Sequence, residues 1–230
     1  MAKIVSICYD GGGWTFPYLA GITKYIQQHP HKRIEYKYAG VSSGACVAAA
    51  AALDIPMDQL MNESLKWIYV CRFIPWSSVI AVKTMCNRII DTRDVSLIKD
   101  KLAINVTKVG WFLRPSPFVI SRFPNKKEMI RTITNSCAIP LINSLSIRRK
   151  YYDGSISLSQ RFFKLPWESH LIINLSTYKD RKGATFMTTN NHKIWNSIFP
   201  LSAKIFIKLY QKGEEDGKMV LDFIITELKI

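Results

Sequence analysis

Ser42 stands at the centre of a short motif with the composition of a nucleophile elbow. In Gly40-Val-Ser-Ser-Gly44, glycines flank this serine two positions away on either side, and an alternating, strand-like run precedes the motif. A sharp turn between a strand and a helix exposes such a hydroxyl above the sheet, and small neighbours let the backbone pass without collision. The pattern therefore predicts a nucleophilic Ser42 and a helix that begins at Ser43. The alternative is a serine that only caps the helix.

Three consecutive glycines after the first hydrophobic run form a second candidate element, Asp10-Gly-Gly-Gly13. The N–H groups of such a loop can converge on one point, which suits a phosphate or the oxyanion of an acyl-transfer intermediate. A dinucleotide-binding fingerprint does not fit, because Phe16 stands where it requires glycine, and the Gly-Lys-Ser/Thr of a P-loop is missing. Gly11, Gly12 and Gly13 are thus candidates for anion binding, with a plain tight turn as the alternative.

A nucleophilic serine needs a proton acceptor, and the sequence offers two kinds. A Ser-His-Asp triad would use a histidine late in the chain, His170 or His192. The other candidate is Asp153 in Tyr-Tyr-Asp-Gly-Ser, where Gly154 permits a tight turn that presents the carboxylate. A carboxylate in a partly dry pocket can accept the serine proton itself, because desolvation raises its basicity. The residue types leave both options open, together with an ordinary Asp-Gly β-turn.

The elements expected around these motifs alternate between strands and helices. Residues 3–9 and 33–39 predict strands, and residues 16–28 and 45–53 predict helices. Such alternation with short loops indicates an α/β protein with a mainly parallel sheet. Farther along we expect helices over residues 57–73, 79–90, 94–101 and 126–137, strands over 103–111, 118–123 and 171–177, and an acidic turn at 213–217 between two helices.

Composition limits the class of protein. The chain has 230 residues, of which 48% are hydrophobic, enough for one domain with a sizeable core. Five dispersed cysteines without a CxxC pair, and four histidines without HExxH, argue against a disulfide framework or a metal site, and we expect no cofactor. The N-terminus lacks the long apolar region of a signal peptide, and the longest apolar run, residues 45–53, is too short to cross a bilayer. We therefore expect an intracellular protein.

The charge is strongly positive: 32 Lys and Arg against 17 Asp and Glu give a net charge of +15. Such a balance favours nucleic acid or a membrane surface with acidic lipids as partner. No basic arm, zinc-finger spacing or RNA-binding aromatic motif is present, so charge alone would support nucleic-acid binding, and solvated faces are the plain alternative. The sequence gives no indication of an oligomeric state. Trp67, Phe73, Ile74 and Trp76 form an apolar stretch that either contacts a membrane or packs between two helices.

The order of the three motifs, DGGG, then GVSSG, then YYDGS, resembles that of the patatin-like phospholipase family. Residues 11–21, GGGWTFPYLAG, are similar to the opening loop and helix of its adiponutrin and adipose-triglyceride-lipase branch. Stretches between residues 105 and 140 also resemble the segment that leads to the catalytic aspartate of this branch. The resemblance covers residues 3–155 well and residues 156–230 thinly. Phe16 departs from the last glycine of the family's GGGxxG, and Thr15 replaces a basic residue of plant patatins.

The resemblance implies a single domain over residues 1–230, with a doubly wound, mainly parallel central sheet flanked by helices and with residues 156–230 completing it. It implies a Ser42–Asp153 dyad and an oxyanion loop at Gly11, Gly12 and Gly13. The implied activity is hydrolysis of phospholipid acyl esters, of the phospholipase A type. Triacylglycerol hydrolysis, transacylation and non-catalytic lipid binding on the same scaffold are the alternatives. The implied partners are a phospholipid or acylglycerol substrate and an anionic membrane surface contacted peripherally.

Overall fold

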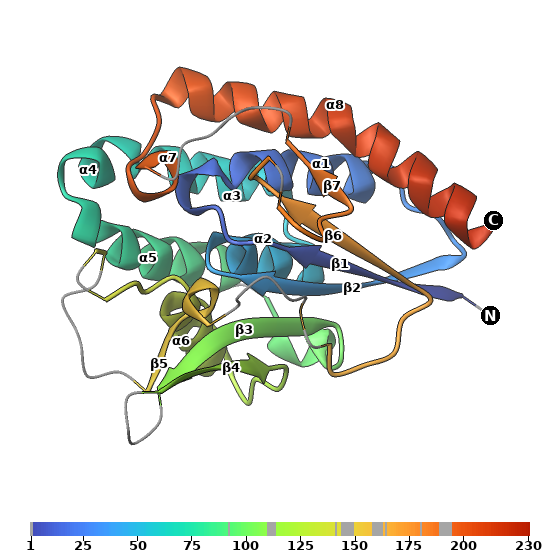
Figure 1. The fold of residues 1–230 in the computed structure, drawn as a ribbon, viewed down its shortest axis with the longest axis horizontal. Coiled ribbons are helices and arrows are strands. Elements are labelled where there is room, and N and C mark those ends of the chain that lie inside the picture. The colour runs from blue at the N-terminus through green and yellow to red at the C-terminus, as the bar shows by residue number, and fades with distance from the viewer. Residues whose placement is uncertain are drawn as a thin grey trace.

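The computed structural model of the chain describes residues 2–91, 93–109, 114–140, 142–143, 150–157, 163, 165–179, 181–188 and 195–230, without the side chains of residues 75, 195 and 196. In this part of the chain, seven strands form one sheet in the order β4-β3-β2-β1-β6-β7, with β5 paired to β3 (Figure 1). The strands are β1 Lys3–Tyr9, β2 Ile34–Val41, β3 Leu102–Val109, β4 Pro115–Ile120, β5 Tyr151–Asp153, β6 Leu171–Ser176 and β7 Phe186–Met187. Strands β3, β2, β1, β6 and β7 are parallel, whereas β4 and β5 run antiparallel to β3.

Helices connect and flank this sheet. They are α1 Pro17–Gln28, α2 Ser43–Ala52, α3 Met57–Leu65, α4 Ile68–Phe73, α5 Ser78–Ile90, α6 Lys126–Ser136, α7 Trp195–Ile198 and α8 Ala203–Leu228. Short 3₁₀ turns occur at η1 Gly13–Thr15, η2 Pro75–Ser77, η3 Val95–Ile98 and η4 Gly154–Ile156. The α/β architecture with a mainly parallel sheet flanked by helices, as the sequence predicts, is therefore confirmed. None of the helices in the described ranges is both long and apolar enough to cross a membrane.

The sheet is positioned by two apolar layers. Helix α2 consists almost wholly of alanine and other small residues, which lets it pack closely on β1, β2 and β3. On the opposite face, the small side chains of Cys8, Ala39 and Ala103 are covered by Leu165 and Trp167 from an irregular segment. The carboxyl ends of the parallel strands consequently meet at one edge, where helix α7 and the start of α5 also lie (Figure 1).

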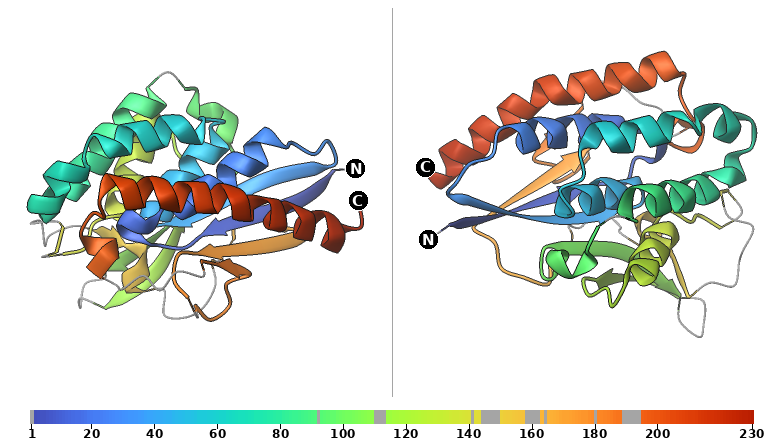
Figure 2. Two further views of the ribbon diagram at one scale, coloured as in Figure 1. Left: turned by 90° about the horizontal axis from the view of Figure 1, so that it is seen from above. Right: turned by 180° about the vertical axis from the view of Figure 1, so that it is seen from behind.

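The acidic turn predicted at residues 213–217 is wrong, because α8 runs without interruption through these residues. Its glycines serve helix packing: a Cβ on Gly213 would lie 2.0 Å from the Tyr18 carbonyl oxygen of α1. Buried Asp216 accepts a hydrogen bond from the Tyr18 hydroxyl at 3.0 Å and pairs with Lys212 at 2.7 Å. Helices α1 and α8 therefore lie side by side (Figure 2). The glycines that resemble those of a turn instead let the two helices approach closely.

Three other predicted elements differ from the structure. The helix expected over residues 94–101 is only the 3₁₀ turn η3. The helix expected over residues 57–73 breaks into α3 and α4, because the Trp67 N–H bonds to the Ser64 carbonyl in a tighter, i→i−3 turn. Pro115 and Pro117, expected in a loop, lie within β4. Strand β4 is at the edge of the sheet, where prolines without an N–H are tolerated.

Candidate active site

Ser42 occupies a strained turn between β2 and α2. Its backbone dihedral angles are φ 54° and ψ −131°, a combination that few residues other than glycine adopt. The flanking glycines are required by close approach: a Cβ on Gly40 would lie 2.4 Å from the Gly44 carbonyl oxygen. A Cβ on Gly44 would lie 2.4 Å from the carbonyl oxygen of Tyr9 on the neighbouring strand. The surrounding packing thus holds Ser42 in a conformation that it would not adopt by itself.

The Ser42 hydroxyl is directed to a carboxylate and not to the helix that it precedes. Its Oγ donates a hydrogen bond to Asp153 Oδ2 at 2.7 Å, and it makes no side-chain capping bond to α2. The Ser42 N–H donates to Ser136 Oγ at 2.9 Å, and Ser136 Oγ donates to the Asn105 carbonyl at 2.7 Å. These two bonds tie the turn at Ser42 to α6, which carries Ser136, and to β3, which carries Asn105. The Ser42 side chain does not cap α2, which was the alternative that the sequence left open.

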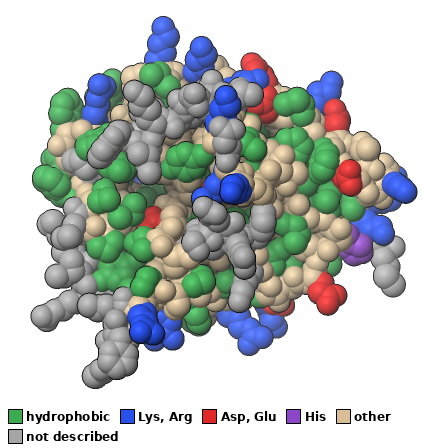
Figure 3. All heavy atoms as spheres, viewed as in Figure 1, with side chains coloured by type: hydrophobic (Ala, Val, Ile, Leu, Met, Phe, Trp, Pro, Cys, Tyr) green, Lys and Arg blue, Asp and Glu red, His purple; other side chains and the backbone are tan. Residues whose placement is uncertain are grey.

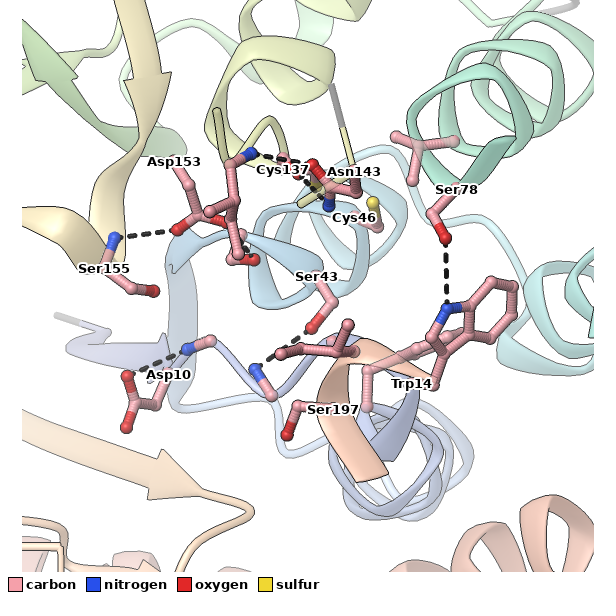
Figure 4. Close-up of a pocket in the computed structure, with 18 of the residues that line it drawn as sticks. Asp10, Trp14, Ser43, Cys46, Ser78, Cys137, Asn143, Asp153, Ser155 and Ser197 are labelled. Atoms are coloured by element: carbon pink, nitrogen blue, oxygen red, sulfur yellow. Dashed lines mark hydrogen bonds between the residues drawn. The ribbon is translucent and has the colours of Figure 1, made fainter. Parts of the chain in front are cut away.

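Asp153 ends the short strand β5 and lies fully inside the protein. Burial raises the pKa of its carboxyl from an ordinary value of 3.8 to about 6, although hydrogen bonds from Ser42 and Ser155 act in the opposite direction. The Ser155 N–H donates to Asp153 Oδ1 at 2.9 Å (Figure 4), and the Thr107 hydroxyl donates to the Asp153 carbonyl at 2.7 Å. A carboxylate with a raised pKa, held 2.7 Å from a serine hydroxyl, has the geometry of a general base.

The glycine loop lies directly beside the elbow, but its N–H groups differ from one another. The Gly11 N–H donates to the Asp10 carboxylate at 2.8 Å, and the Gly12 N–H contacts Ser43 Oγ at 3.2 Å (Figure 4). The Gly13 N–H has no partner among the residues that the structure describes. Gly13 has a φ of 50°, and a Cβ there would lie 1.9 Å from the Ser197 carbonyl oxygen of α7, so no other residue fits.

Phe16 does not crowd this loop. Its φ of −56° lies in the ordinary helical region, and its ring packs edge-on against Phe206 of α8, with 5.5 Å between centroids. Thr15 stabilises the loop by hydrogen bonding: its Oγ1 donates to the Gly12 carbonyl at 2.7 Å and lies 3.0 Å from Thr177 Oγ1. Both departures from the family pattern therefore leave the loop intact.

Of the two histidines considered as alternative bases, His170 lies in the described part of the chain, and it is not near Ser42. His170 Nδ1 accepts a hydrogen bond from the N–H of Ile4, at the amino end of β1, whereas Ser42 follows the carboxyl end of β2. Parallel strands place these two ends at opposite edges of the sheet. His192 lies outside the described residues.

A cavity of about 570 Å³ extends from Ser42 and Asp153. Its walls are largely apolar and include Trp14, Phe16, Trp67, Val82, Met85 and Ile139. Two cations, Lys179 and Arg181, line it as well. Arg181 pairs with Asp10 at 2.9 Å; burial raises the pKa of Asp10, and Arg181 opposes that shift. Cavities of this volume with mainly apolar walls hold small organic ligands.

Several residues of the site had no signal in the sequence. Ser136 and Thr107 contact Ser42 or Asp153, but they lie on elements whose packing only the folded sheet reveals. Ser155 contacts Asp153 from two positions along the chain, within the same Asp-Gly-Ser motif. Ser43 adjoins Ser42, and its N–H, at the first position of α2, lacks an acceptor within the helix. A nucleophile elbow places that N–H at the oxyanion, and this rule could have identified it.

Comparison with known proteins bears on the fold. No family model matches the chain. The chain is 23% identical, over a match 248 positions long, to the omega-hydroxyceramide transacylase of Homo sapiens. The match covers 94% of this chain and 45% of that protein. VipD from Legionella pneumophila has a TM-score of 0.53 at 10% identity, covering 94% of this chain and 66% of VipD. The ExoU–SpcU complex from the type III secretion system of Pseudomonas aeruginosa has a chain with a TM-score of 0.51 at 14% identity, covering 100% of this chain and 52% of that one.

These neighbours define the class of fold. ExoU and VipD have patatin-like folds, and this chain shares that fold. The curated relative is a patatin-like protein of the adiponutrin-like branch, so the resemblance predicted from the three motifs is confirmed. The chain spans less than half of the length of this relative.

Proposed function

We propose that this chain is a patatin-like lipid acyl hydrolase that cleaves carboxylic ester bonds of phospholipids. One observation carries the proposal. Ser42 has a strained backbone, does not cap α2, and donates a 2.7 Å hydrogen bond to the fully buried carboxylate of Asp153 at one end of a largely apolar cavity. A helix-capping serine would instead direct its hydroxyl to the N–H groups of the helix. The patatin-like relative supports the same class of lipid chemistry.

The reaction has two steps. Asp153 accepts the Ser42 proton while Ser42 Oγ attacks the ester carbonyl, and the alcohol leaves with the proton that Asp153 returns. Water, deprotonated by Asp153, then attacks the acyl-enzyme and releases the fatty acid with Ser42 restored. In both steps the oxyanion receives hydrogen bonds from the N–H groups of Gly13 and Ser43, and from the N–H of Gly12 once it releases Ser43 Oγ. Gly11, held by Asp10, shapes the loop.

The cavity favours an acyl chain bound next to a phosphate. Its apolar walls suit a fatty acyl chain, and Lys179 lines it without an ion-pair partner among the described residues. Arg181 is neutralised by Asp10, which leaves Lys179 as the cation available to a phosphodiester. A neutral acylglycerol has no group that would use this charge. We therefore put phospholipids before triacylglycerol as the substrate class.

Transacylation is the second candidate, because the human relative is named a transacylase. The acyl-enzyme is the same in both reactions, and only the acceptor differs: a lipid hydroxyl replaces water. The two are separated by product analysis in the presence of an acceptor alcohol.

The test is a hydrolysis assay on phosphatidylcholine and phosphatidylserine vesicles, with free fatty acid measured by mass spectrometry. Ser42→Ala and Asp153→Asn should each reduce the rate at least 10³-fold while the fold is retained, a loss of the size seen for missing nucleophiles and bases. The matched control is His170→Ala, which should keep the rate of the parent. Fatty acid release by purified Ser42→Ala at the parental rate would refute the proposal, and so would a parent protein that releases none.

A further inference from the structure

Helix α4, turn η2 and the start of α5 expose an unusual number of large apolar side chains. Phe73 is 78% exposed, Tyr69 68%, Ile80 58% and Trp76 54%, and Val70 and Ile74 are also exposed. We call these six residues the α4–α5 face. All six lie within the twelve consecutive positions 69–80. Figure 3 shows hydrophobic side chains gathered at the edge of the molecule where Figure 1 places α4. Contiguous exposed patches of this kind mark binding surfaces.

The core does not account for these residues. Helix α4 already buries Ile68 and Cys71 on its inner side, so its packing requirement is met. Its outer side would ordinarily be polar, yet Arg72 is the one charged residue in the helix. A short helix that is apolar on both sides needs a second apolar environment. The sequence left two options for this stretch, membrane contact or packing between helices. In the structure its residues differ: Trp67 lines the cavity, whereas Phe73 and Trp76 are exposed.

The α4–α5 face is continuous with the candidate active site. Trp67 and Ser78, at the ends of the same stretch, line the cavity, as do Ala81 and Val82 of α5. Ile80 of the same helix is exposed on the other side. A single helix layer therefore separates the cavity from whatever covers the face.

Charge identifies the occupant. Residues 67–90 contain Arg72, Lys83 and Arg88 but no aspartate or glutamate, in a chain of net charge +15. Arg88 pairs with Glu63 of α3 at 3.2 Å, so Arg72 and Lys83 carry the charge argument. In a contact between two copies of this chain through this face, Arg72 and Lys83 of one copy would meet the same cations of the other. An anionic lipid surface, in contrast, takes both the cations and the apolar side chains, and Trp and Tyr prefer the boundary between headgroups and acyl chains.

We propose that the α4–α5 face docks on an anionic phospholipid bilayer and inserts Phe73 and Trp76 among the lipids. The docking places the bilayer beside the cavity, so an acyl chain passes from lipid to protein over a short path. This gain for catalysis rests on the proposed function; the binding itself does not, and it is tested with inactive Ser42→Ala protein.

The experiment is co-sedimentation with vesicles of phosphatidylcholine containing 30% phosphatidylserine. The double substitution Phe73→Ser/Trp76→Ser should weaken binding at least tenfold, because each side chain loses the gain from leaving water. The matched control, Leu97→Ser/Met219→Ser, removes apolar residues that are 71% and 56% exposed on η3 and α8, and it should bind like the parent. Vesicles without phosphatidylserine, or 0.5 M salt, should also weaken binding.

Folding and catalysis are checked separately. With Ser42 intact, the Phe73→Ser/Trp76→Ser protein should hydrolyse monomeric 4-nitrophenyl butyrate at the parental rate but vesicle lipid at least tenfold more slowly. Unchanged vesicle binding by this variant overturns the proposal, as does an equal loss in the control variant. Dimers that the substitution dissociates, without vesicle binding by the parent, would assign the face to a second copy and also overturn it. Vesicle binding by a parent that hydrolyses no ester would refute the proposed function and leave the docking intact.

Discussion

Replacing Asp153 by asparagine should stabilise the protein while it removes the activity. The asparagine side chain has nearly the same size and can satisfy the same neighbours: its amide oxygen accepts from the Ser155 N–H, and its amide nitrogen donates to Ser42 Oγ. What the substitution removes is the ionised carboxylate, which burial disfavours in the folded state.

The magnitude follows from the pKa of Asp153, which burial raises from 3.8 to about 6. Each pKa unit corresponds to about 1.4 kcal/mol, so ionisation of this group lowers the free energy of unfolding by about 3 kcal/mol above pH 7. Between pH 3.8 and about 6, the folded state binds more protons at this group than the unfolded state does. The contribution of Asp153 to stability therefore decreases as the pH rises through this window and is constant above it.

The assay is urea denaturation of the parent and of Asp153→Asn at a series of pH values. We expect the variant to be more stable by up to about 3 kcal/mol at pH 8 and the difference to shrink toward zero near pH 4. Comparing the two proteins at each pH cancels the other titrating groups. A variant less stable than the parent at pH 8, or a difference that does not change with pH, would refute the assignment of a destabilising, ionised Asp153.

Three further predictions concern the same site. The rate on monomeric 4-nitrophenyl butyrate should rise with pH around a midpoint near 6, because the base must be ionised. A rate that does not change between pH 4.5 and 8 would contradict the role of Asp153. Ser136→Ala should lower the free energy of unfolding by about 1–3 kcal/mol in urea denaturation, since the Ser42 N–H loses its acceptor; an unchanged value would show that the bond is not needed. Lys179→Ala should lower the rate on phosphatidylcholine relative to diacylglycerol about tenfold, and equal losses on both substrates would argue against a phosphate contact.

Local motifs predicted the part of the site that depends on neighbours in the chain. The strand, the turn at Ser42 and the helix after it follow from the spacing of Gly40 and Gly44, because the close contact of Gly40 is with Gly44 itself. The contact of Gly44 with Tyr9 of β1 needs the folded sheet. The residue types alone left Asp153 beside two alternative histidines, because 111 positions separate it from Ser42, and only the family resemblance selected it. The pairing of β5 with β3 brings it to the turn, and that pairing has no signature in the sequence.

The wrong turn at residues 213–217 and the undecided stretch at residues 67–76 have a common cause. Gly213 and Gly217 have the composition of a turn, but they permit the close approach of α8 to α1. Glycine appears in both settings, and only the partner helix distinguishes them. The same holds for the apolar stretch from Trp67 to Trp76, because composition does not tell which of its side chains lie inward. Tertiary contacts decide both cases.

The central claim is that Asp153 activates Ser42 as a nucleophile, and covalent labelling tests it most directly. The protein is treated with a fluorophosphonate, and the modified peptide is identified by mass spectrometry in the parent, Ser42→Ala and Asp153→Asn. We expect one adduct on Ser42 in the parent, none in Ser42→Ala, and labelling at least 100-fold slower in Asp153→Asn. An adduct on another residue, or equal labelling rates in the parent and Asp153→Asn, would contradict the claim.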